Sequence, residues 1–190
     1  MAAAKSLTPE EIQRVLQHIS THANAPRNRC MLLISVMAGL RVGEIAGLKL
    51  CDVRAADGTI RAEIPLAAAR VKHGHARTVF VSTRLQAELA DYVAGIKWVS
   101  DEQPLFHPAN ARRRHFTPNT LAQLFFWLYR AAGISGASSH SGRKTFLTSL
   151  ASQGVSVYVL ASLAGHKSIA TTQKYITVND AMKRKAVELV

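Results

Sequence analysis

Six residues spread over the chain have side chains that together could act on a phosphodiester. In chain order they are Arg41, Lys72, His140, Arg143, His166 and Tyr175. A guanidinium group can hold two phosphate oxygens through parallel hydrogen bonds, and it keeps its proton at neutral pH. Imidazoles and an amine can carry protons to and from the reacting atoms, and a phenol can attack phosphorus. The set therefore predicts attack by a tyrosine on a phosphodiester.

The two arginines are distinguished by their sequence surroundings. A lone arginine is usually a solvated surface residue. Arg41, however, lies between apolar helical segments, and Arg143 follows His140 by three residues, a spacing that puts both side chains on one helix face. Taken singly, His140 and His166 are better interpreted as structural histidines. The positions of Arg41 and Arg143 indicate that both side chains could reach one phosphate in the same cleft.

Tyr175 is the candidate nucleophile among four tyrosines. It follows His166 by nine residues and lies beside a polar run, Thr171 to Lys174. The other three, Tyr92, Tyr129 and Tyr158, fall within apolar helical patterns, which predicts that they are core aromatics.

These residues lie in fragments that carry a family resemblance. The fragments are AGLRVGEIAGLKL (residues 38–50), RVKHGHARTVFV (70–81), HSGRKT (140–145) and LAGHKSIATTQKYI (163–176). In this order they resemble the catalytic domain of tyrosine recombinases, the lambda-type phage integrase family. The resemblance extends from about Leu7 to Asn179. Gly142 and Lys144 depart from it, standing where many members have leucine and histidine.

The resemblance implies how the phosphate is bound. Arg41 would be the first arginine of the family, and the family's H-x-x-R element would supply His140 and Arg143. The G-H element would place His166 against the phosphate as well. Glu44 matches an acidic position that orients Arg41, and this supporting role is preferred to the alternative of an exposed helix carboxylate.

The resemblance also implies the covalent chemistry. Tyr175 would attack the phosphodiester and form a 3′-phosphotyrosyl intermediate, and Lys72 would protonate the departing 5′-oxygen. His140 or His166 could take the phenolic proton. No cofactor is implied. A metal site is disfavoured as well, because the His18/His22 pair lacks an intervening glutamate and His73/His75 lack nearby carboxylates or cysteines.

Composition supports a globular nucleic-acid binder. The chain has 190 residues, of which 48% are hydrophobic, and its formal net charge is +12. An excess of basic residues of this size is typical of proteins that bind nucleic acid, although charge alone also allows a basic protein without such a partner. Two cysteines are too few for a disulfide framework, and no apolar run is long enough to cross a bilayer. We expect a cytoplasmic, nucleoid-associated protein of bacterial or phage origin.

Local signals predict a mainly α fold with a small three-stranded antiparallel β-sheet, the fold of the tyrosine recombinase catalytic domain. Thr8-Pro9-Glu10-Glu11 predicts a helix start with a capping box, and Asp57-Gly58 predicts a turn. Lys72 would lie near a hairpin tip. Strands are expected at 59–64 and 77–82, and helices after the first at about 27–38, 42–48, 83–96, 117–132, 141–153, 156–164, 169–176 and 179–190.

The expected organisation is a single catalytic domain, residues 1–190, without the N-terminal core-binding domain that family members usually carry. Double-stranded DNA is the expected partner. We expect a monomer in free solution that assembles, as a tetramer, only on DNA, with possible help from accessory DNA-bending proteins. The apolar stripe of the tail, Ala181, Ala186, Val187 and Leu189, could dock onto a neighbouring protomer or pack on its own domain. Two other functions stay open: a DNA-binding module without activity of its own, and a topoisomerase-like nicking-closing enzyme.

Overall fold

The computed structural model describes residues 4–66, 76–97, 99–109, 111, 114–176 and 180–188. The predicted mainly helical fold with a small antiparallel sheet is confirmed. The elements are α1 (Pro9–Ser20), α2 (Ala25–Ala38), α3 (Val42–Ala46), α4 (Leu50–Val53), β1 (Glu63–Leu66), β2 (Arg77–Phe80), α5 (Thr83–Ala94), α6 (Pro118–Ala131), α7 (Ser141–Ser152), α8 (Val157–Ala164), α9 (Ile169–Gln173) and α10 (Asp180–Val187).

The helix boundaries follow local chemistry. The hydroxyl of Thr8 accepts from the backbone N–H of Glu11, whose carboxylate accepts from the Thr8 N–H, so the predicted capping box of α1 is confirmed. Thr117 caps α6 and is followed by proline in the same way. Helix α2 ends at Gly39, which has a φ of 64°. This left-handed conformation favours glycine and turns the chain directly into Arg41.

The sheet is smaller than the sequence predicted. Among the described residues it has two antiparallel strands, in which Glu63 pairs with Phe80 and Leu66 with Arg77. The sequence predicted a strand that begins at residue 59, but β1 begins at Glu63. The turn at Asp57-Gly58 brings Arg54 opposite Ile60 in an isolated bridge, and the Arg61 N–H donates to the Val53 carbonyl. The chain there pairs with the end of α4, so the ladder begins only at Glu63.

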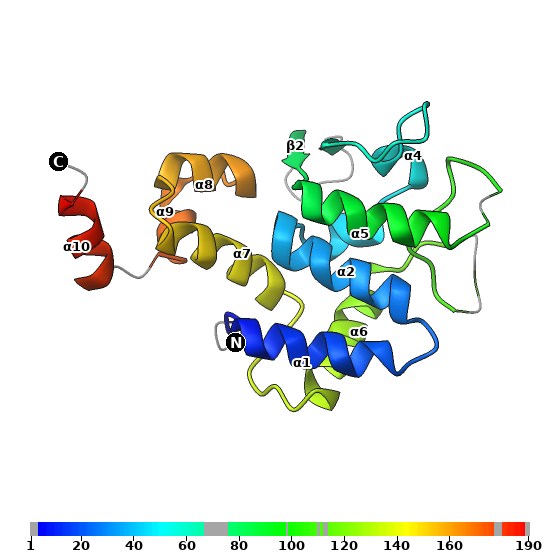
Figure 1. Ribbon diagram of the computed structural model, residues 1–190, viewed down its shortest axis with the longest axis horizontal. Coiled ribbons are helices and arrows are strands. Elements are labelled where there is room, and N and C mark those ends of the chain that lie inside the picture. Colours follow the sequence, from blue (N-terminus) through cyan, green and yellow to red (C-terminus); the bar gives the residue numbers. More distant parts are fainter. Residues whose placement is uncertain are drawn as a thin grey trace.

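Most of the core is built around α2. Figure 1 shows this helix between α1 and α5, with α7, α8 and α9 gathered to one side of them. Close contact between α2 and α7 explains the unusual glycine at position 142. A Cβ there would come within 2.2 Å of the Ser35 hydroxyl oxygen, so the leucine typical of the resembled family would not fit.

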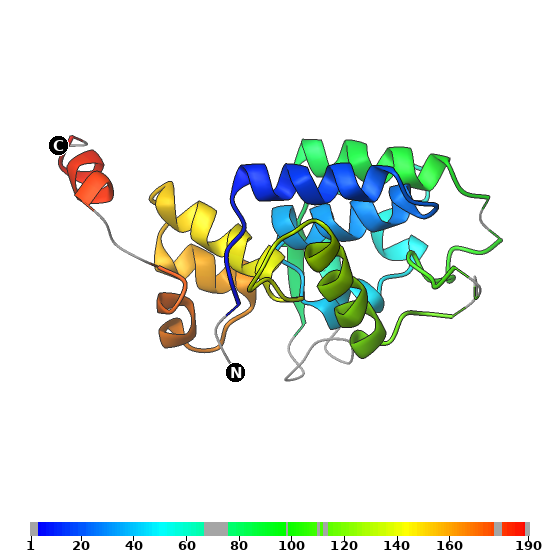
Figure 2. The same ribbon diagram turned by 90° about the horizontal axis from the view of Figure 1, so that it is seen from below.

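A smaller apolar cluster joins the last helices. Leu147 and Ala151 of α7 pack against Leu160 and Ala164 of α8, and the partly buried Tyr175 and Ile176 pack on this cluster. These contacts position the segment after α9. Helix α10 lies beyond this cluster at one end of the molecule (Figure 2), and Val187 on it is exposed. Ala181 and Leu189 of the proposed tail stripe lie outside the residues whose side chains are described.

Three of the predictions about tyrosines can be compared with burial. Tyr92 and Tyr129 are buried, as predicted for core aromatics. Tyr158 is 70% exposed, so its assignment to the core was wrong. Helix α8 is apolar on all sides in sequence, and only the face carrying Leu160, Ala161 and Ala164 is covered. In such a helix the spacing of hydrophobic residues does not indicate which face is buried.

Candidate active site

Arg41 is held by a buried carboxylate one turn along the chain. It occupies the N-cap position of α3, and its Nη1 donates to Glu44 Oε1 at 2.8 Å while its backbone N–H donates to Oε2 at 2.8 Å. The side chain of Glu44 is only 2% exposed, whereas that of Arg41 is 21% exposed. The Nε and Nη2 groups of Arg41 have no partner in the described part of the chain. Glu44 therefore orients a guanidinium that, among the described residues, keeps four of its five N–H donors available.

Arg143 is fixed by the ends of two helices. Its Nη1 donates to the Gly39 carbonyl at the end of α2, and its Nη2 donates to the Ala164 carbonyl at the end of α8, both at 2.6 Å. A third contact joins Nη2 to His166 Nε2 at 3.0 Å. Helix ends leave carbonyl groups unpaired, and arginines satisfy them. Of the five N–H donors of Arg143, two have no partner among the described residues and remain for a ligand.

His166 connects the arginines to Tyr175. Its Nδ1 lies 2.8 Å from the hydroxyl of Thr172, and its ring stacks on that of Tyr175 with centroids 5.7 Å apart. Gly165, just before it, has a φ of +62°, and a Cβ there would come within 2.5 Å of Arg77 Cδ. The glycine of the G-H element is needed for both its conformation and its close contact. The turn that it makes brings the imidazole against Arg143.

Arg77 also belongs to this cluster. Its Nη2 donates to Glu44 Oε2 and its Nη1 donates to the Leu163 carbonyl, both at 2.8 Å, and its side chain is 8% exposed. The backbone carbonyls of Leu163 and Ala164, at the end of α8, thus accept hydrogen bonds from Arg77 and Arg143, respectively. Arg77 thereby connects the end of α8 to Glu44, the carboxylate that orients Arg41.

The cluster carries an excess of positive charge. Burial would raise the pKa of Glu44, but the charges and hydrogen bonds of Arg77 and Arg41 outweigh burial and hold that pKa below its ordinary value. Burial, together with the charge of Arg41, lowers the pKa of Arg143 to about 10. Burial and the three nearby guanidinium groups lower the pKa of His166 to about 4, so the imidazole is neutral at pH 7. Three cations against one carboxylate leave two uncompensated positive charges.

The structure brings Arg41, Glu44, Arg143, His166 and Tyr175 into one connected cluster. His140 lies at the N-cap position of α7 with its side chain exposed, three residues before Arg143. Lys72 lies outside the described residues, so its predicted place in the site stays a prediction.

Sequence reasoning missed two members, Arg77 and Thr172. A signal existed for Arg77: in a strand it shares a face with Val79, and a charged residue on an apolar face indicates a buried partner. In the structure, Arg77 and Val79 lie opposite Leu66 and Ile64, the buried residues of β1. Thr172 is one of two adjacent threonines, and nothing in a single sequence distinguishes it from Thr171.

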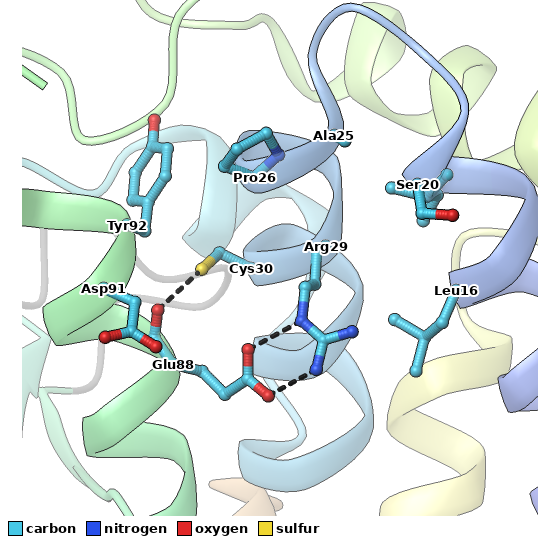
Figure 3. A pocket seen from close by; sticks show the side chains of 10 residues that line it. Leu16, Ser20, Ala25, Pro26, Arg29, Cys30, Glu88, Asp91 and Tyr92 are labelled. Carbon is cyan, nitrogen blue, oxygen red and sulfur yellow. Dashed lines mark hydrogen bonds and ion pairs between the residues drawn. The ribbon is translucent and has the colours of Figure 1, made fainter. Parts of the chain in front are cut away.

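A cavity of about 330 Å³ lies away from this cluster, between α1, α2 and α5 (Figure 3). The fork of Arg29 binds Glu88 at its edge, and the Cys30 thiol donates to the Glu88 carbonyl. None of the predicted site residues lines it. Within the described ranges no cluster of three or more potential metal ligands occurs, and no helix is long and apolar enough to span a membrane.

Comparisons with known proteins show what this chain is similar to. The model of the phage integrase family matches residues 5–182. The tyrosine recombinase XerA of Pyrococcus furiosus is 29% identical over 97% of this chain and 61% of its own length. XerA of Thermococcus kodakarensis is 31% identical over 97% of this chain and 62% of its own length. XerD of Mycobacterium leprae is 32% identical over 92% of this chain and 57% of its own length. The chain thus spans about three fifths of these relatives.

Solved structures show the same fold. A crystal structure of XerA recombinase superposes with a TM-score of 0.75 at 25% identity, covering all of this chain and 66% of the other. The catalytic domain of bacteriophage HP1 integrase superposes with a TM-score of 0.70 at 22% identity, covering 98% of this chain and 95% of the other. The Tn1549 transposon integrase, solved in complex with a circular intermediate DNA, superposes with a TM-score of 0.77 at 19% identity, covering 100% of this chain and 67% of the other.

Proposed function

Because the chain belongs to the phage integrase family, we propose that it is the catalytic domain of a site-specific recombinase that breaks and rejoins DNA through Tyr175. The observation that carries this proposal is the cluster of three arginines around one carboxylate. An excess of two positive charges in a partly buried place is costly unless an anion binds there. A DNA phosphate supplies that anion, and the net charge of +12 suits the rest of the polyanion.

The arginines bind the phosphate in this proposal. Arg41 and Arg143 direct their unpaired N–H groups to the nonbridging oxygens, where negative charge increases as the nucleophile approaches. Their other N–H groups are already fixed by Glu44, Gly39 and Ala164. Preorganised donors of this kind stabilise a transition state without having to reorient during the reaction.

The bond changes balance as follows. The phenolic oxygen of Tyr175 forms a bond to phosphorus and gives its proton to a histidine, His166 or His140. The bond from phosphorus to the 5′-oxygen breaks, and that oxygen takes a proton from Lys72. Attack by a 5′-hydroxyl on the phosphotyrosyl ester then reverses the sequence and rejoins the strand, so no external energy source is needed.

A library of nicked duplexes with randomised sequence tests the proposal. Cleavage near the nick releases a short 5′-hydroxyl fragment, so the adduct cannot religate and accumulates. We expect a complex that resists denaturation, with the phosphate mapped to Tyr175 by mass spectrometry. The captured sequences would reveal the target site. Binding without any adduct on the whole library would instead indicate a DNA-binding module.

Lys72 has its own prediction. Replacing it with alanine should slow cleavage by roughly 10²–10⁴-fold, the range for loss of a general acid. A substrate with a 5′-bridging sulfur leaves readily without a proton and should recover most of the rate in Lys72→Ala. Single-turnover rates on the oxygen and sulfur substrates measure this. Equal impairment on both would show that Lys72 does not protonate the leaving group.

We further propose double-stranded DNA as the partner of this chain, with a monomer in free solution and assembly, as a tetramer, on DNA. The 190-residue chain should bind short duplexes weakly and with little sequence preference, mainly through phosphate contacts. The logarithm of its binding constant should fall with the logarithm of salt concentration, with a slope of about −0.9 per phosphate neutralised. Fluorescence anisotropy across a salt series measures this slope. Tight, salt-insensitive binding of one duplex by the monomer would contradict it.

A further inference from the structure

The carboxylate of Glu44 is divided between two arginines that differ in burial. Its Oε1 accepts from Nη1 of Arg41, and its Oε2 accepts from Nη2 of Arg77 and from the Arg41 backbone N–H, each at 2.8 Å. The side chain of Arg77 is 8% exposed, whereas that of Arg41 is 21% exposed. Arg77 therefore binds the carboxylate from the interior, and Arg41 binds it from the more exposed side.

The other surroundings of Arg77 enclose it within the protein. Its Nη1 donates to the Leu163 carbonyl at 2.8 Å, and its Nε is buried without a partner in the described part of the chain. A Cβ on Gly165 would come within 2.5 Å of Arg77 Cδ and 3.2 Å of Nε, so the turn at Gly165 covers this part of the side chain. An arginine enclosed in this way acts on a bound phosphate through its charge and through the groups that it holds.

The charge balance around Glu44 shows what Arg77 adds. Arg41 and Glu44 alone would cancel each other, whereas two guanidinium groups and one carboxylate leave one positive charge. We infer that Arg77 is a positioning residue that neutralises Glu44, so that Glu44 can orient Arg41 without cancelling its charge toward the phosphate. The catalytic consequence of this inference rests on the proposed function, whereas the pairing of Arg77 with Glu44 can be tested without DNA.

The ionisation of Glu44 supports this role. Burial is the largest influence on its pKa and raises it, and the charge of Arg77 is the largest of the influences that lower it. Hydrogen bonds from Arg41 and Arg77 and the charge of Arg41 complete the set, and the resulting pKa lies below the ordinary value. Burial lowers the pKa of Arg143, and the charge of Glu44 partly offsets this, so Arg143 also senses the carboxylate. Without Arg77, the buried carboxylate would be harder to ionise.

The first experiment tests the pairing in the absence of DNA. Carboxyl ¹³C spectra across a pH series follow the ionisation of Glu44, and Glu44→Gln identifies its signal. The pKa of Glu44 should rise in Arg77→Met, because burial then has less to oppose it, and should stay low in Arg77→Lys, which keeps the charge. Thermal melting shows that each variant is folded. A Glu44 pKa that is unchanged in folded Arg77→Met overturns the inference.

Adduct formation on nicked duplexes tests the consequence. Arg77→Met should slow it roughly 10- to 100-fold, the range for removing a group that orients a metal ligand. Adding Glu44→Gln restores the net charge and keeps an amide oxygen that can accept from Arg41, so the double variant should react faster than Arg77→Met. If Arg77 only braced the end of α8, Glu44→Gln would restore nothing. A normal rate in Arg77→Met, or a double variant no faster than it, overturns the inference. Arg77→Gln, uncharged but still a donor, gives the same comparisons if Arg77→Met does not fold.

Arg29 and Glu88 supply the matched control, because they form another arginine–glutamate pair, at the cavity away from the cluster (Figure 3). Arg29→Met and Arg29→Met/Glu88→Gln make the same changes in net charge, and both should form the adduct within a few-fold of the normal rate. Equal slowing in Arg29→Met would indicate a general effect of charge on DNA binding and would overturn the inference. If the unmodified protein forms no adduct, the proposed function fails, while the titration of Glu44 still decides whether Arg77 neutralises it.

Discussion

Replacing Tyr175 with phenylalanine should abolish the denaturation-resistant protein–DNA adduct and leave the affinity for duplex DNA almost unchanged. Phenylalanine keeps the ring that stacks on His166 and packs on the α7–α8 cluster. Only the phenolic oxygen is removed, and with it the atom that would bond to phosphorus. Denaturing gels with labelled nicked duplex measure the adduct, and anisotropy measures affinity.

Tyr158→Phe is the matched control for this experiment. Tyr158 is 70% exposed on α8, so the same loss of one oxygen occurs on the surface of a neighbouring helix. It should form the adduct at the normal rate. Persistence of the adduct in Tyr175→Phe, or its loss in Tyr158→Phe alone, would remove Tyr175 from the role of nucleophile.

Replacing either phosphate-binding arginine with lysine should slow cleavage by about 10²–10³-fold, the usual effect of removing one preorganised donor to a developing anion. Lysine keeps the positive charge but has no planar fork. At position 143 a single ammonium group cannot reach the Gly39 and Ala164 carbonyls and His166 in the same geometry. We expect Arg143→Lys to lose thermal stability as well, because buried carbonyls lose their donor.

Arg41→Lys should separate catalysis from stability. Arg41 is more exposed, and its one side-chain partner among the described residues is Glu44, which an ammonium group can still bind. Its melting temperature should therefore stay close to that of the unmodified protein while cleavage slows. Arg29→Lys is the control, since Arg29 forks onto Glu88 at a cavity away from the cluster (Figure 3). Near-normal cleavage by Arg41→Lys or Arg143→Lys would exclude that arginine from the phosphate site.

The sequence by itself determined the features that depend on neighbours along the chain. Thr8 and Thr117 marked two helix starts, and Gly39 marked the end of α2, because capping bonds and left-handed turns involve residues a few positions apart. Helical spacing placed Glu44 one turn from Arg41 for the same reason, but the residues alone did not decide that the carboxylate would be buried against it. Residue types also limited the chemistry. Arginines are suited to binding a phosphate, and few other side chains, among them tyrosine, can attack phosphorus.

Only the tertiary structure decided which side chains complete the cluster. Arg77 lies 33 positions from Glu44 and 86 from Leu163, and no local pattern predicts which buried groups such a distant residue will meet. Thr172 and Thr171 are chemically identical, and the packing of α9 on α8 selects the one that is buried against His166. The face that α8 exposes, with Tyr158 on it, was decided likewise. Burial is a property of the assembled helices, because each face is covered only by elements far away in the chain.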